Sequence, residues 1–121
     1  MIINITNNKT IEELQADFNN EFPYLKIQFF KHSHKMFKGS DKKELIPIST
    51  TIGALKHHNG AIEISDNMTV SDLETMFKQK LGLNVQVFRK SGRSWLETTV
   101  TDNWTLRKQN DEGKELSVLE I

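Results

Sequence analysis

The pattern of apolar and polar positions is nearly the same in two stretches of the chain. Each stretch opens with isoleucines that alternate with polar residues, which is typical of a half-buried strand. Apolar residues three and four positions apart follow, and this spacing predicts an amphipathic helix. The helical positions are Ile11, Leu14, Phe18 and Phe22 in the first stretch and Val70, Leu73, Phe77 and Leu81 in the second. A second alternating segment comes next, at Ile27 to Lys31 and at Val85 to Arg89, so each stretch predicts a β-α-β unit.

Both predicted helices begin at a threonine. Thr10 stands three residues before Glu13, and Thr69 stands three residues before Asp72. A threonine hydroxyl and a carboxylate at this spacing form a capping box, which satisfies free backbone N–H groups at the start of a helix. A proline after the first predicted helix and a glycine after the second mark their ends.

We expect residues 1–121 to form one domain, because a chain of this length has room for one core and not for two. The two copies span about 2–31 and 61–90, with a basic loop at 32–48 and a C-terminal extension at 93–121. Two β-α-β units in series predict an α+β two-layer sandwich. In the ferredoxin-like form of this sandwich, both helices lie on one face of a single antiparallel sheet. A β-grasp or another duplicated layer fold remains open.

The extension carries its own signals. Ser91 and Gly92 form a turn dipeptide, so residues 95–100 are expected to return as an added hairpin strand. Thr105 then marks the start of a further helix, and Gly113 is expected to break it.

Composition and charge exclude several classes of function. Sixteen basic and sixteen acidic side chains balance, so no net field draws the chain to nucleic acid or to an anionic membrane. The chain has no cysteine, which excludes disulfides, thiolate catalysis and thiolate metal sites. The N-terminal residues are too polar for a signal peptide, and no apolar run approaches the length of a membrane span. We therefore expect a cytoplasmic protein without membrane contact.

Three segments resemble a family of small bacterial conserved hypothetical proteins: Phe22 to Ile27, Leu83 to Gly92 and Trp95 to Leu106. The resemblance spans most of the chain and implies a bacterial, cytoplasmic protein. That family has no assigned activity, so the resemblance implies no site residue and no mechanism.

Strand alternation gathers aromatic residues on one sheet face. If one side of each inner strand packs against the helices, then Phe30 and Phe88 point to the opposite face, and Trp95 joins them from the returning strand. Basic residues flank these aromatics, so we predict a non-enzymatic binding module that engages a protein partner or a second copy of itself. The predicted partner-binding residues are Phe30, Phe88, Trp95, Arg89, Lys90 and Arg93.

Two alternatives stay open for this face. Aromatics with a basic rim resemble the stacking platform of single-stranded nucleic-acid binders, although the specific RNA-binding signature is missing. The other alternative is that the C-terminal segment with Trp104 and Leu106 folds back over the face and buries its aromatics.

Other features predict no reaction chemistry. His32 and His34, and His57 and His58, form pairs without the spacing of a metal site. The lysine-rich loop lacks the glycine spacing of a phosphate-binding loop, and no nucleophile elbow is present. The sequence therefore predicts neither an enzyme nor a metal or cofactor site.

Overall fold

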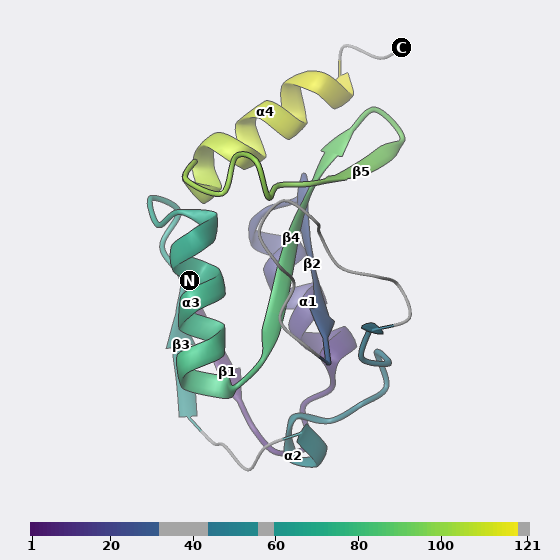
Figure 1. The fold of residues 1–121 in the computed structure, drawn as a ribbon, viewed down its shortest axis with the longest axis vertical. Coiled ribbons are helices and arrows are strands. Elements are labelled where there is room, and N and C mark those ends of the chain that lie inside the picture. The colour runs from purple at the N-terminus through teal and green to yellow at the C-terminus, as the bar shows by residue number, and fades with distance from the viewer. Residues whose placement is uncertain (32–43, 56–59, 119–121) are drawn as a thin grey trace.

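The computed structural model describes residues 1–31, 44–55 and 60–118. These residues form an α+β fold with four helices and two antiparallel sheets (Figure 1). The strands are β1 (Ile2–Ile5), β2 (Leu25–Phe30), β3 (Gly60–Glu63), β4 (Asn84–Ser91) and β5 (Ser94–Glu97). The helices are α1 (Ile11–Glu21), α2 (Ile52–Leu55), α3 (Val70–Leu81) and α4 (Leu106–Val118).

The strands pair in two separate sheets. β1 pairs with β3, and the second sheet has the order β2-β4-β5. Each β-α-β unit therefore places its first strand in one sheet and its second strand in the other. This order departs from the expected ferredoxin-like arrangement, in which one sheet holds the strands of both units.

The helix starts match the prediction from the sequence. The Thr10 hydroxyl accepts a hydrogen bond from the Glu13 N–H at 3.1 Å, and the Glu13 carboxylate accepts one from the Thr10 N–H at 3.0 Å. Thr69 and Asp72 form the same reciprocal pair at 3.0 and 3.1 Å. Both capping boxes are thus confirmed, and they fix where α1 and α3 begin.

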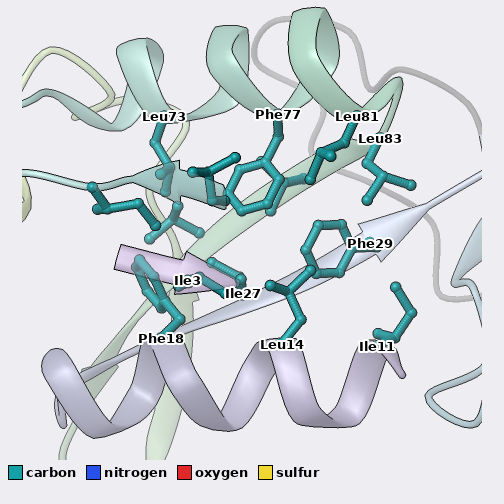
Figure 2. Packing of buried hydrophobic residues seen from close by; sticks show 14 of the residues in the cluster. Ile3, Ile11, Leu14, Phe18, Ile27, Phe29, Leu73, Phe77, Leu81 and Leu83 are labelled. Carbon is teal, nitrogen blue, oxygen red and sulfur yellow. The ribbon is translucent and has the colours of Figure 1, made fainter. Parts of the chain in front are cut away.

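The core lies between α1 and α3, with strand residues between the two helices (Figure 2). Phe18 of α1 and Phe77 of α3 are fully buried, and their side chains point into this core from opposite sides. The Phe77 ring meets the Phe29 ring edge-on at a centroid distance of 5.4 Å. Burying one such side chain stabilises the fold by about 1.5–3 kcal/mol, so these apolar stripes supply much of the stability.

Backbone hydrogen bonds of the first half recur in the second. Four N–H donors around the starts of α1 and α2 have counterparts around the starts of α3 and α4. Written from donor to acceptor, Ile11 to Thr50 matches Val70 to Trp104, and Glu12 to Ile48 matches Ser71 to Asp102. In the same way, Ile52 to Lys9 matches Leu106 to Met68, and Gly53 to Asn7 matches Arg107 to Asp66. In this correspondence α4 is the counterpart of α2, and Trp104 is the counterpart of Thr50.

The recurrence extends to the sheet edges. The Ile46 N–H donates to the Phe29 carbonyl at 2.8 Å, as the Thr98 N–H donates to the Val87 carbonyl at 3.3 Å. Residues 44–46 thus lie along the edge of β2 as β5 and Thr98 lie along the edge of β4. Residues 93–121 were expected to be an extension, but β5, Thr98 and the start of α4 have counterparts in residues 44–55.

An approximate two-fold relation follows from the strand registers. Ile3 pairs with its own counterpart Ile62, and Gln28 pairs with its own counterpart Gln86. Pairs of this kind lie on a two-fold axis, as at the centre of a symmetric dimer interface.

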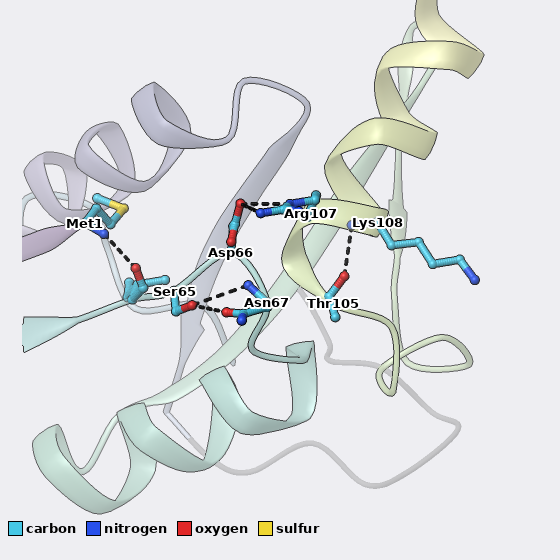
Figure 3. A network of polar contacts seen from close by, with 8 residues as sticks. Met1, Ser65, Asp66, Asn67, Thr105, Arg107 and Lys108 are labelled. Carbon is cyan, nitrogen blue, oxygen red and sulfur yellow. Dashed lines mark hydrogen bonds and ion pairs between the residues drawn. The ribbon is translucent and has the colours of Figure 1, made fainter.

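The start of α4 is fixed by a side-chain contact (Figure 3). The Arg107 guanidinium donates to the Asp66 carboxylate at 2.9 Å from Nε and 2.7 Å from Nη2. The expected break at Gly113 is wrong, since α4 runs on to Val118. A Cβ atom at Gly113 would lie 2.9 Å from the Cβ of Tyr24, so glycine here allows close packing of α4.

Candidate functional site

Two strand registers bring aromatic and basic side chains together on one face of the β2-β4-β5 sheet. Lys26 of β2 pairs with Phe88 of β4, and Lys90 of β4 pairs with Trp95 of β5. Paired residues of antiparallel strands share a face, and so do residues two apart on one strand. These four half-buried residues, Lys26, Phe88, Lys90 and Trp95, form what we call the Trp95 patch.

Cations lie over the aromatic rings of this patch. The Lys26 ammonium is 4.9 Å from the Trp95 ring centroid and 5.6 Å from the Phe88 ring centroid. The Lys90 ammonium is 5.9 Å from the Trp95 centroid. Attraction of a cation to a ring face at this range contributes about 0.5–1 kcal/mol at an exposed site. The contacts therefore hold the lysines on the patch while leaving it positively charged.

A groove of about 370 Å³ adjoins the patch. Trp95 and Lys26 line it together with α1 residues such as Gln15 and Asn19. Ile48, which is 51 % exposed, also lines the groove. The patch thus continues into a hollow that offers apolar contact next to fixed positive charge.

Beside this groove, side-chain amides of α1 bind the outer edge of β2. Gln15 donates to the Ile27 carbonyl at 2.9 Å, and Asn19 donates to the Leu25 carbonyl at 2.8 Å. These bonds satisfy backbone acceptors on the outer edge of β2, which would otherwise invite another strand. Beyond them, residues 44–46 lie along the rest of the same edge.

The structure brings together some of the predicted residues and separates others. Phe88, Trp95 and Lys90 share the patch as expected, and Arg93 is exposed in the turn between β4 and β5. Phe30 is only 2 % exposed, because it lies in the β2 segment that Leu45 covers, so it offers no accessible anchor.

Arg89 lies on the opposite face, because strand alternation separates it from its neighbours Phe88 and Lys90. Its guanidinium donates to the Gln109 side chain of α4 at 3.0 Å and lies 5.4 Å from the Trp104 ring centroid. Arg89 therefore joins α4 to the sheet and is no part of the patch.

Sequence reasoning missed Lys26 and Ile48. Alternation along β2 places Lys26 on the face of Gln28 and Phe30, so the signal was present, but its pairing with Phe88 depends on the register. Ile48 reaches the groove through the backbone bond from Glu12 to its carbonyl, which no local pattern indicates.

The C-terminal segment, as far as residue 118, does not cover the patch. Leu106 is fully buried in the core, and α4 packs on the face of Arg89. Trp104 is half-buried there, with the Lys108 ammonium 4.2 Å from its ring centroid. The segment with Trp104 and Leu106 therefore does fold back onto the sheet, but on the face opposite the patch.

The carboxyl group of Glu74, which lies outside the patch, has a shifted pKa. Burial raises the pKa of Glu74 on α3 to about 7, and repulsion from Asp102 adds to the shift. Glu74 lines a hollow of about 340 Å³ together with Lys78, which donates to Asn84 at 3.1 Å. Glu74 is the counterpart of Gln15, so this hollow corresponds to the groove beside the patch.

Several other features predicted from the sequence fall outside the part of the chain that the structure describes. Most of the basic loop 32–48, and His32, His34, His57 and His58, lie outside the described residues. Among the residues that are described, no cluster of three potential metal ligands occurs. In the same part of the chain, no helix has both the length and the apolar character to span a bilayer.

Comparison with known proteins identifies no relative. No family model, no curated protein and no solved structure matches this chain. The Trp95 patch is therefore interpreted from its own geometry.

Proposed function

We propose that the protein is a non-enzymatic cytoplasmic binding module whose Trp95 patch docks an acidic segment of a partner protein. The observation that carries the proposal is the Lys26 ammonium, which lies within 6 Å of both the Trp95 and the Phe88 ring centroids. Tryptophan is among the commonest anchors of protein interfaces, and rim charges select and steer the partner.

The charge of the patch favours an acidic partner over a second copy of the chain. Lys26 and Lys90 lie on the patch and Arg93 lies in the adjoining turn, whereas Glu97 pairs with Phe88 as an acidic neighbour. A two-fold dimer would place this surface against itself and oppose like charges. An acidic segment avoids that repulsion and places carboxylates near the lysines.

The groove adds room for an apolar side chain. Exposed Ile48 and the aliphatic part of Lys26 line it beside Trp95. A partner segment that alternates acidic and apolar residues would contact the lysines and insert its apolar side chains here. This arrangement matches the composition of interfaces, with an apolar centre and a charged rim.

Single-stranded nucleic acid is the alternative that the same residues suggest. Bases bind such proteins by stacking on open aromatic faces. In this structure Lys26 and Lys90 lie over the Trp95 ring, so a base would have to displace them before it stacked. An acidic peptide needs no such displacement, and for this reason we favour the protein partner.

The test compares baits in affinity capture from lysate of the native host, with and without nuclease. The baits are the wild type, Trp95→Ser, Lys26→Glu with Lys90→Glu, and the matched control Lys80→Glu on an exposed part of α3. The captured protein is then purified and its dissociation constant measured against each variant.

We expect one acidic protein to be retained by the wild type and by Lys80→Glu, and lost from the other two baits, whether or not nuclease is present. Loss of the patch cations should weaken the purified complex at least tenfold. Equal retention by all baits would overturn the proposal. Retention that disappears with nuclease would indicate that the patch binds nucleic acid instead of a protein.

A further inference from the structure

Another hollow, which shares no residue with the Trp95 patch, lies where residues of the first half meet the end of α3. It has a volume of about 360 Å³, within the range of small-molecule sites. Its apolar wall includes Phe30, Ile46, Leu81 and Leu83, which are all buried. Lys31, Thr50 and Leu55 also line it, and all three reach the surface to some degree.

These last three residues have counterparts in the second half. The matched backbone bonds from Ile11 to Thr50 and from Val70 to Trp104 make Trp104 the counterpart of Thr50. By the same correspondence of α2 with α4, Gln109 is the counterpart of Leu55. The equivalence of β2 and β4 makes Arg89 the counterpart of Lys31.

In the second half these counterparts contact one another. The Arg89 guanidinium lies 5.4 Å from the Trp104 ring centroid and donates to Gln109 at 3.0 Å. An aromatic ring beside a cation thus occupies this place. In the first half the small Thr50 stands at the position of Trp104, and it lines the hollow.

We propose that this hollow is a binding site for a small aromatic carboxylate. The ring takes the place of Trp104 in the second half, against Leu81 and Leu83. The carboxylate pairs with Lys31, the one charged group among the described residues that line the hollow. The two halves therefore differ here: the second half places its own tryptophan beside Arg89, whereas the first half leaves a hollow beside Lys31.

This inference is independent of the proposed function, because it uses another surface and another ligand. Indole-3-acetate supplies the ring and the carboxylate, indole lacks the charge, and tryptamine reverses it. The experiment is isothermal titration calorimetry of the full chain with each compound.

The decisive variant is Thr50→Trp, which places in the first half the side chain found in the second. Its matched control is Ser49→Trp, which adds the same ring one residue away, outside the lining. Lys31→Gln removes the cation while keeping most of the side-chain length. Circular dichroism and a thermal melt confirm that each variant is folded.

We expect saturable 1:1 binding of indole-3-acetate, weaker binding of indole and no binding of tryptamine. Thr50→Trp should abolish binding, Ser49→Trp should preserve it, and Lys31→Gln should weaken it about tenfold, as expected for one charge-assisted contact. If Thr50→Trp does not fold, Thr50→Phe takes its place. Absent binding to the wild type, unchanged binding to the filled variant, or equal binding of tryptamine would each overturn the proposal.

Discussion

The Gln15 side chain donates to the carbonyl oxygen of Ile27 at 2.9 Å, and its counterpart in the second half is Glu74. The two positions face corresponding hollows, yet an amide is a donor at any pH, whereas a carboxyl group is a donor only when protonated. The raised pKa of Glu74, about 7, fits a place built for a neutral side chain.

Glu74→Gln should therefore stabilise the protein above neutral pH. In the wild type the folded state holds the Glu74 proton more tightly than the unfolded state, whose pKa is near the ordinary 4.5. This contribution is fully present below pH 4.5 and is lost as the pH rises through about 7. We expect a gain of about 1–3 kcal/mol at pH 8 and little change at pH 4.5.

Urea unfolding at both pH values measures this effect, and Glu115→Gln on the exposed part of α4 serves as the control. An equal gain at both pH values would contradict the assignment of the titration to Glu74.

Removing a helix cap should cost a definite amount of stability. Thr69→Ala removes the hydroxyl that accepts from the Asp72 N–H at 3.0 Å. We expect a loss of about 1 kcal/mol in the free energy of unfolding, and a much smaller loss for Thr69→Ser, which keeps the acceptor. Chemical denaturation of the two variants checks this, and equal losses would show that the methyl group matters more than the cap.

Gly113→Ala should destabilise the protein although alanine favours helices. Alanine gains about 1 kcal/mol in helix propensity over glycine. Its Cβ would lie 2.9 Å from the Tyr24 Cβ and 3.0 Å from the Tyr24 carbonyl oxygen, however, so α4 would have to move away. A crowded contact of this kind costs about 1–3 kcal/mol.

We therefore expect a net loss in a thermal melt for Gly113→Ala, and almost none for Lys114→Ala on the exposed side of the same helix. A higher melting temperature for Gly113→Ala would mean that the close approach to Tyr24 is easily relieved.

Replacing the aromatic residues of the Trp95 patch should abolish partner binding with little loss of stability. Phe88 and Trp95 are half-buried, so replacing both by serine removes contact area at the surface more than in the core. We expect the double variant to lose partner binding with a loss of at most about 1–2 kcal/mol in stability. Differential scanning calorimetry measures this loss. Failure of the variant to fold would instead place these aromatics in the core.

Much of the local structure followed from the sequence. The spacing of apolar residues and the threonine caps predicted α1 and α3, because both signals act within a few residues. Alternation also placed Phe88 and Trp95 on one face. The same rule puts Arg89 on the other face, so its separation from Phe88 and Lys90 could be predicted from the sequence.

Local sequence patterns could not predict how the strands are divided between two sheets. Nothing in the alternation of Ile3 or Ile27 indicates which strand pairs with which, since pairing depends on contacts between distant segments. Gly113 misled for a related reason: its role depends on Tyr24, far away in the chain. The correspondence of Thr50 with Trp104 is likewise visible only in backbone hydrogen bonds.

The most direct test of the Trp95 patch uses the chain's two tryptophans as probe and internal control. Each gives one indole N–H signal in a nitrogen-edited NMR spectrum, and Trp104→Phe assigns them. The titrant is a glutamate-rich peptide with interspersed leucines, and oligothymidylate is titrated in parallel. We expect the peptide to shift the Trp95 signal in a saturable way while Trp104, on the opposite face, stays unchanged, and we expect Lys26→Glu with Lys90→Glu to remove the shift. A Trp95 signal that does not move with the peptide, or that moves only with the oligonucleotide, would contradict the account.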